Sequence, residues 1–153
     1  MILSSFWRRV LGMSDKPKIV DALGAATAAQ GLLAASALQR SDIVYGSNAN
    51  GQYWRVPDSN GSGGLQVCIG TGVPAGATST ASGVIFQSNV DAAVTFPATF
   101  DGTPMVQGVS ENGNRWASGA FNVTSSGCNL RALAGTSSAT AVNISFIAIG
   151  RYT

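Results

Sequence analysis

Hydrophobic and polar residues alternate most regularly near the C-terminus, with the period of two that is typical of a half-buried β-strand. One face of this strand carries Val142, Ile144, Phe146, Ala148 and Gly150. The other face is polar at Asn143 and becomes apolar at Ile147 and Ile149. We therefore expect the second half of the strand to leave solvent and to meet a facing sheet or another subunit.

Five further strand-like runs precede this one at even spacing, separated by turn signals rich in Gly, Asn, Asp and Ser. The expected strands are 83–87, 92–96, 105–110, 117–123, 129–134 and 141–149. No helical period interrupts them. The pattern predicts a mainly β protein whose residues 84–153 form a six-stranded antiparallel β-sandwich.

Residues 41–70 predict a β-hairpin module ahead of the sandwich. A junction rich in Gly and Asn, over 41–51, is followed by two strand-like runs, 52–56 and 65–69, with a Gly-rich loop between them. The next segment, 71–83, consists mainly of Gly, Ala, Thr and Ser. That composition is typical of a linker.

An N-terminal helix is predicted over residues 19–40. Apolar and small residues recur there in alternating steps of four and three from Ile19 to Arg40, the spacing of a coiled-coil seam. Because Ala and Gly make this seam thin, we expect the helix to pack against symmetry copies or a host protein. An alternative stays open: residues 19–38 are long enough to cross a bilayer and carry Asp21 as their only charge.

The first 18 residues predict a docking peptide. Phe6 and Trp7 stand next to Arg8 and Arg9, and large aromatic side chains beside arginines are typical of anchors at protein interfaces. The charges follow the apolar run, whereas those of a secretory signal precede it. We expect these four residues to dock on another protein of a larger particle; the alternative is a frayed terminus.

Charged residues make up 10% of the 153 residues, against about a quarter in an average protein. This composition suits a protein whose surface is largely covered by copies of itself. The net charge of +2 is uneven, since the first 40 residues carry five cationic side chains against two carboxylates. Attraction to an acidic partner is therefore expected only at the N-terminus, and no nucleic-acid partner is expected.

The chain contains no histidine, which excludes Ser-His-Asp and Cys-His nucleophiles and His-based zinc sites. Four carboxylates lie in or next to predicted turns, without a spacing that places two of them across a cleft. They are Asp58, Asp91, Asp101 and Glu111. Cys68 and Cys128 match no metal-ligand spacing and either pair or pack as small buried hydrophobes, the second being favoured. We predict no enzyme activity, no metal and no cofactor.

Residues 47–58 read SNANGQYWRVPD and are followed by Gln66-Val67-Cys68. This stretch resembles one that is common near the C-terminal ends of bacteriophage tail-fibre proteins, with residues 59–64 as an insertion that lengthens the hairpin tip. The resemblance implies a fibre protein on the surface of a virion.

The C-terminal segment resembles the H-type lectin domain in the order and spacing of short motifs. They are Val94-Thr95-Phe96 with Phe100, then 104–106, Asn114-Arg115, 121–127 and 144–148. The resemblance implies a six-stranded β-sandwich that assembles as a trimer and binds sugars, typically N-acetylgalactosamine. The family's Trp-His pair would fall near Ala134 and Gly135, so of its sugar contacts only the arginine, Arg115, carries over plainly.

Asn114, Arg115 and Trp116 are therefore the candidate ligand-binding residues. Arg115 would donate in-plane hydrogen bonds to sugar hydroxyls. Two alternatives stay open: Arg115 pairs with a carboxylate of Asp91, Asp101 or Glu111 to hold the trimer, and Trp116 packs in the core.

Together these patterns predict a homotrimeric virion protein of a phage or phage-like particle. Its N-terminus would bind capsid, neck or tail proteins, and its C-terminal domain would bind a host-surface glycan. The alternative is a purely structural decoration protein of the particle that binds no ligand.

Overall fold

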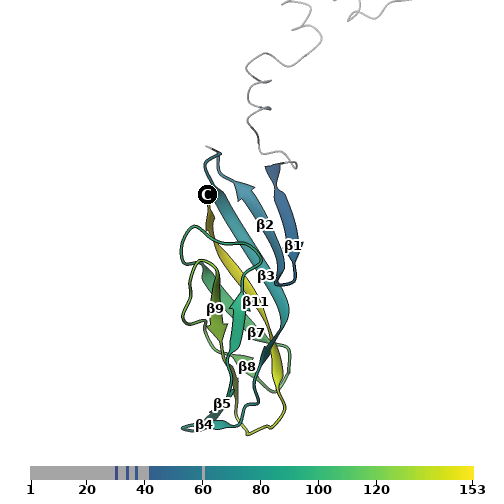
Figure 1. Cartoon of the computed structure of the whole chain (residues 1–153), viewed down its shortest axis with the longest axis vertical. Helices are drawn as coiled ribbons and strands as arrows, with labels where there is room; N and C mark the ends of the chain where they lie inside the picture. Colours follow the sequence, from purple (N-terminus) through teal and green to yellow (C-terminus); the bar gives the residue numbers. More distant parts are fainter. Residues whose placement is uncertain (1–29, 31–33, 35–36, 38–41, 60) are drawn as a thin grey trace, which may run out of the picture. The chain divides into compact units, whose positions relative to one another are not determined.

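The computed structural model describes residues 42–59 and 61–153, together with Gln30, Ala34 and Ala37 (Figure 1). The predicted docking peptide with Phe6, Trp7, Arg8 and Arg9 lies outside the described residues, as does the predicted helix over 19–40 apart from those three positions. In the described part of the chain, no helix is long and apolar enough to cross a membrane. The described strands all belong to one compact unit, Gln39–Thr153.

The described chain forms β-strands in three antiparallel groups. They are β1 (Val44–Asn48), β2 (Gly51–Pro57), β3 (Gly64–Ala75), β4 (Thr80–Ser82), β5 (Ile85–Gln87), β6 (Ala92–Thr95), β7 (Met105–Ser110), β8 (Trp116–Ala117), β9 (Gly127–Leu130), β10 (Ala132–Ala134) and β11 (Val142–Tyr152). A five-stranded sheet has the order β1-β2-β3-β11-β7, a four-stranded sheet β4-β5-β10-β8, and β6 pairs with β9. The predictions of a mainly β chain and of antiparallel pairing are confirmed.

The hairpin and the C-terminal strands share one sheet instead of forming separate modules. Residues 71–75, which the sequence assigned to a linker, continue β3, and β3 pairs with β11 from Gly64↔Tyr152 to Ala75↔Val142. A bulge at Thr71 and Gly72 interrupts this pairing, and Gly72 has a φ of 70°. Small residues occur both in linkers and in bulged strands, so composition alone did not distinguish the two.

The predicted set of six sandwich strands is wrong in two places. Run 129–134 divides at Arg131 into β9 and β10, which pair in different sheets. In run 117–123 only Ala117, the last residue of β8, lies in a strand, and Phe121 forms one isolated bridge with Asn129. Asn122 has a φ of 50°, a left-handed conformation that ends an extended strand.

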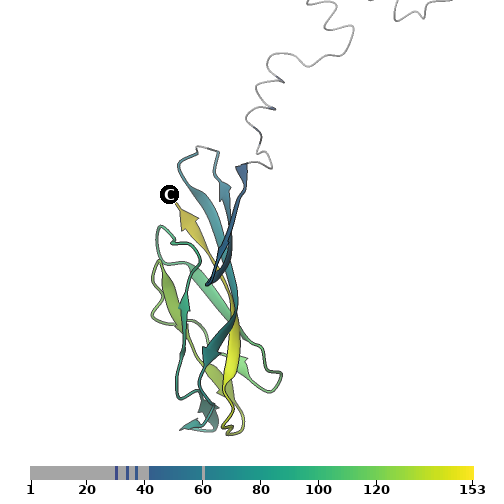
Figure 2. The same cartoon turned by 45° about the vertical axis from the view of Figure 1, so that its right-hand side comes forward.

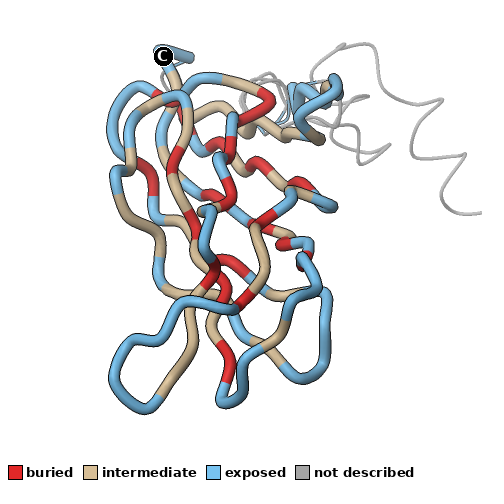
Figure 3. The backbone as a smooth tube through the Cα atoms, turned by 60° about the horizontal axis from the view of Figure 1, so that its bottom comes forward, coloured by how far each residue is buried: buried red, intermediate tan, exposed pale blue. Residues whose placement is uncertain are grey.

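The core lies between one face of the five-stranded sheet and the β6–β9 pair, as Figures 1 and 2 show. Figure 3 shows buried positions alternating with more exposed ones along the strands. Three aromatic rings meet in this core: Phe96 lies 5.3 Å from Phe100, edge to face, and 5.9 Å from Phe146. All three side chains are at most 5% exposed.

The stretch that resembles tail fibres is a structural unit that joins the hairpin to residues 96–100. Asn48 donates a hydrogen bond of 2.9 Å to the carbonyl of Pro97. Gln66, which is fully buried, donates to the carbonyls of Ala98 (3.0 Å) and Thr99 (3.2 Å) and accepts from Nε of Arg55 (2.7 Å). The side chains of Asn48, Arg55 and Gln66 are therefore hydrogen-bonded within the fold.

Gly51 allows the turn of this motif to form. Its φ is 133°, and a Cβ there would lie 2.0 Å from the carbonyl oxygen of Ile69. Any other residue would be strained in this conformation and would also collide with the β3 backbone. This close approach explains a glycine at the end of the SNANG sequence.

Cys68 and Cys128 are free, buried thiols, so the favoured prediction that they pack as small hydrophobes is confirmed. Burial raises the pKa of both thiols above the ordinary value of 9.0, and raises the pKa of Cys128 to about 11. In each case the main cause is desolvation of the thiolate.

The raised thiol pKa values predict a loss of stability at alkaline pH. The contribution is fully present below pH 9.0, where the thiols are protonated in both states, and is lost as pH rises toward the folded pKa of about 11. In that window the unfolded chain releases protons that the folded chain retains. We expect the urea midpoint of Cys128→Ala to fall less between pH 8 and pH 10.5 than that of the wild type. An equal fall of the urea midpoint in both proteins would contradict the prediction.

Candidate functional site

Three loops gather at one end of the β domain, which we call the loop end. They are the β4–β5 turn, residues 111–115 after β7, and residues 135–141 before β11. The pairings Val142↔Ala75 and Ile144↔Ser110 place the second and third loops together. Figure 1 shows the loop end opposite the C-terminus and the start of β1.

Arg115 links two of these loops. One Nη of its guanidinium donates to the hydroxyl of Ser138, and the other donates to the carbonyl of Ala141 at 3.5 Å. Ser138 is itself held by a backbone hydrogen bond of 3.0 Å to Thr78. Both acceptors are neutral oxygens, and they use two of the five N–H donors of the guanidinium, so further donors are left for a ligand.

The loop that carries Arg115 is held by its own polar side chains. Asn112 accepts a hydrogen bond of 3.1 Å from the backbone N–H of Asn114 through its side-chain oxygen. Its carbonyl accepts one of 3.1 Å from the N–H of Arg115. Such side-chain turns are typical of Asn. The side chain of Asn114 is exposed on this turn, next to Arg115.

Trp116 is 46% exposed, so the alternative that it packs in the core is wrong. It belongs to the short edge strand β8 and pairs with Leu133 of β10. Because β8 is an edge strand of only two residues, no neighbouring strand covers much of the Trp116 ring. Val84, in the β4–β5 turn, is 93% exposed. The loop end therefore offers apolar surface as well as the charge of Arg115.

Within one subunit, Glu111 and Asp91 bind other groups than Arg115, and a pairing of Arg115 across a trimer boundary stays a prediction. Glu111 accepts hydrogen bonds from the backbone N–H of Gly72 (2.7 Å) and the hydroxyl of Ser145 (2.6 Å). Both bonds hold the pKa of Glu111 below its ordinary value, and the bond from Ser145 has the larger effect. Glu111 thus supports the bulge in β3.

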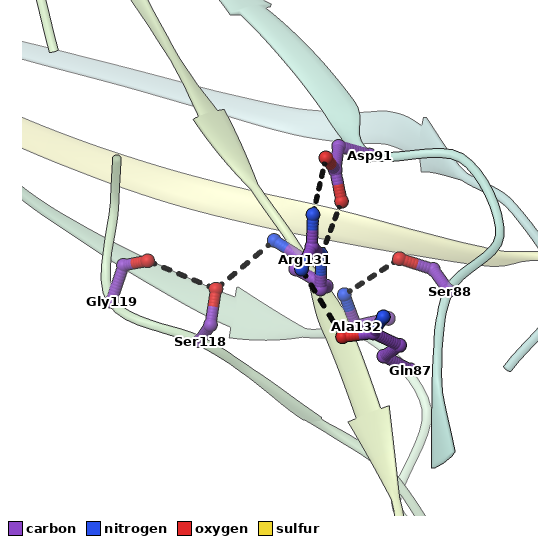
Figure 4. Close-up of polar contacts among 7 residues, drawn as sticks. All are labelled: Gln87, Ser88, Asp91, Ser118, Gly119, Arg131 and Ala132. Atoms are coloured by element: carbon purple, nitrogen blue, oxygen red, sulfur yellow. Dashed lines mark hydrogen bonds and ion pairs between the residues drawn. The ribbon is translucent and has the colours of Figure 1, made fainter. Parts of the chain in front are cut away.

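Asp91 pairs with Arg131 instead. Figure 4 shows two parallel bonds, from Nε to Oδ1 at 2.6 Å and from Nη2 to Oδ2 at 2.9 Å, and a third from Nη1 to Gln87 at 3.1 Å. The guanidinium also lies 5.2 Å from the centre of the Phe121 ring. The hydrogen bonds to Asp91 raise the pKa of Arg131.

Arg131 stands where the chain passes from the β6–β9 pair to the four-stranded sheet, so its contacts position the strands beneath the loop end. The N–H of Ser118 donates a hydrogen bond of 2.7 Å to the carbonyl of Arg131, and the Ser118 hydroxyl accepts one of 3.2 Å from the N–H of Arg131. No local spacing in the sequence indicates a role for Arg131, because its partner Asp91 lies 40 residues away. We assign it a structural role.

Two open hollows flank the β1–β2 turn. One, of about 320 Å³, is lined by residues 47–52 and 69–71; the other, of about 210 Å³, lies between residues 49–50, 71–74, Ala93 and Thr95. Both linings lack charged side chains. In the described part of the chain, His, Cys, Asp and Glu form no group of three that could hold a metal.

No known protein family and no curated protein matches this chain. Among solved structures, an N-truncated R1-type pyocin tail fibre matches with a TM-score of 0.53 and 23% identity, over 83% of this chain and 98% of that chain. A longer C-terminal piece of the P. aeruginosa R1 pyocin fibre matches with a TM-score of 0.47 and 19% identity, over 92% of this chain and 32% of that chain.

The first match shows that this chain shares its fold with a tail-fibre fragment. It therefore supports the tail-fibre resemblance of residues 47–68 at the level of the fold. The matches described are tail fibres, and the H-type lectin resemblance stays a prediction.

Proposed function

We propose that this chain is a fibre protein on the surface of a phage or phage-like particle, and that its loop end binds the host cell. The fold shared with the R1-type pyocin tail fibre supports the fibre assignment. The observation that carries the binding assignment is the position of Arg115. Its loop, residues 111–115, belongs to the loop end, and its guanidinium is held by the neutral oxygens of Ser138 and Ala141.

The proposed ligand is a glycan of the host surface. Sugar hydroxyls accept hydrogen bonds from a guanidinium, and a half-exposed indole such as that of Trp116 offers an apolar face to a sugar ring. Asn114 supplies an amide beside them. In this proposal the protein is a homotrimer, so that three weak sites act together through avidity. Its first 18 residues, with Phe6, Trp7, Arg8 and Arg9, dock on a capsid, neck or tail protein.

Binding of the full-length protein to bacterial cells and to an array of bacterial polysaccharides and N-acetylgalactosamine glycans tests the proposal. We expect saturable binding to one sugar class and a loss of at least about tenfold in Arg115→Ala, equivalent to 1.4 kcal/mol. The matched control is Arg151→Ala, an exposed arginine at the other end of the domain, which should bind like the wild type.

A purely structural decoration protein is the competing function. It predicts that the wild type binds neither cells nor glycans, or that Arg115→Ala binds as the wild type does. Circular dichroism and light scattering on the same samples establish that fold and assembly are intact. Under those conditions either result contradicts the receptor-binding proposal.

A further inference from the structure

The outward face of the five-stranded sheet carries an apolar row that crosses every strand. The register joins Tyr45 to Trp54, Trp54 to Val67, Val67 to Ile149 and Ile149 to Met105. Side chains directly opposite each other on neighbouring strands point to the same face. The five therefore form one continuous line, and Met105 and Tyr45 at its ends are 79% and 55% exposed.

The neighbouring row extends this apolar surface. It runs from Ser47 through Gln52, Ile69 and Ile147 to Gln107, with two isoleucines at its centre and uncharged polar groups at its edges. Leu65 and Val109, 48% and 60% exposed, continue the surface on either side. We call these twelve residues the outer face.

The opposite face of the same sheet is already used by the core. Its central row is Gly46, Tyr53, Cys68, Ala148 and Val106. Cys68 and Ala148 are completely buried, and Tyr53 and Val106 pack against the core. An antiparallel sheet with one buried face ordinarily presents polar residues on the other. Apolar residues on both faces indicate that the second face is also covered.

We propose that the outer face is the surface through which this chain associates with further copies of itself, and this rests on the homotrimer of the proposed function. The rows contain no charged side chain, and Arg151, beside Leu65, already pairs with Asp58 at 3.1 Å. Interfaces between identical subunits are more apolar than transient interfaces and carry few charges at their centre. When two copies meet through this face about a symmetry axis, the apolar centre of one copy lies against that of the other, and the glutamine side chains lie at the rim of the contact.

The outer face has the size of the apolar centre of an interface. Strands about 4.8 Å apart and same-face residues about 6.7 Å apart give it roughly 400 Å², the scale of a functional apolar patch and about half of the 800 Å² that one partner of a standard interface buries. The 320 Å³ hollow beside the β1–β2 turn is lined partly by Ser47, Gln52 and Ile69 of this face. Side chains of a neighbouring copy can enter this uncharged hollow.

Light scattering of the full-length protein after size exclusion, between about 1 and 100 µM, tests the inference. We expect an oligomer for the wild type and, for Met105→Lys and Ile149→Lys, at least about a hundredfold weaker association, equivalent to about 2.7 kcal/mol. Met105 is so exposed that its replacement leaves the folded subunit intact. Val90→Lys replaces a 61% exposed apolar residue outside the outer face and should associate as the wild type does.

Each outcome has a distinct meaning. A monomeric wild type overturns both the inference and the homotrimer, and indicates that another segment or protein covers this face. An oligomer that survives both lysine substitutions overturns only the inference. A dimer that the substitutions dissociate supports the inference and contradicts the threefold assembly. Failure of glycan binding with an intact, lysine-sensitive oligomer affects the proposed receptor role alone.

Discussion

Phe96→Ala is expected to lower the free energy of unfolding by about 3–5 kcal/mol, the usual cost of removing a buried aromatic ring. Phe96 contacts both Phe100 and Phe146, so its loss opens a cavity between β11 and residues 96–100. Typical domains are stable by only about 5–15 kcal/mol. A substantial unfolded fraction at 37 °C is therefore expected, and urea unfolding at one protein concentration measures the change.

Two companion variants test the cause of this effect. Thr95→Ala, at the exposed neighbouring position in β6, should change stability by less than about 0.5 kcal/mol. Phe96→Leu retains much of the apolar volume and should lie between Thr95→Ala and Phe96→Ala. Equal, small losses in all three variants would contradict the packing described for the three rings.

Gln66→Leu is expected to destabilise the protein by about 2–4 kcal/mol although it introduces a more apolar side chain. The substitution leaves the carbonyls of Ala98 and Thr99 and the Nε of Arg55 without their partner. The Arg55 guanidinium also loses the hydrogen bond that holds it between the rings of Tyr53 and Tyr152, 5.3 and 4.9 Å away. Thermal unfolding of the variant measures the loss.

A double-mutant cycle separates this network from a simple loss of packing. In Gln66→Leu/Arg55→Leu the N–H donor left without its acceptor is also gone, so the combined loss should be smaller than the sum of the single losses by at least about 0.5 kcal/mol. Strict additivity would mean that the two side chains act independently, contrary to their 2.7 Å hydrogen bond.

The sequence by itself determined that the chain is mainly β, which face of β11 enters the core, and which arginine is the candidate for binding. Alternation at period two is a local property, because successive side chains of any strand point to opposite faces. It placed Ile144 and Phe146 inside and showed that Ile147 and Ile149 form a second apolar face. The absence of histidine is equally independent of the fold. What the sequence left open was what covers that second face.

Only the tertiary structure decided which strands pair and which charges meet. Arg131 binds Asp91 across 40 residues, and Arg115 binds Ser138 across 23, distances at which sequence spacing carries no signal. The linker assigned to residues 71–83 proved in part to be strand, because β3 is completed by β11 and its bulge is held by Glu111. Pairing in a sheet is satisfied by partners far along the chain, so a local pattern indicates a strand without indicating its neighbour.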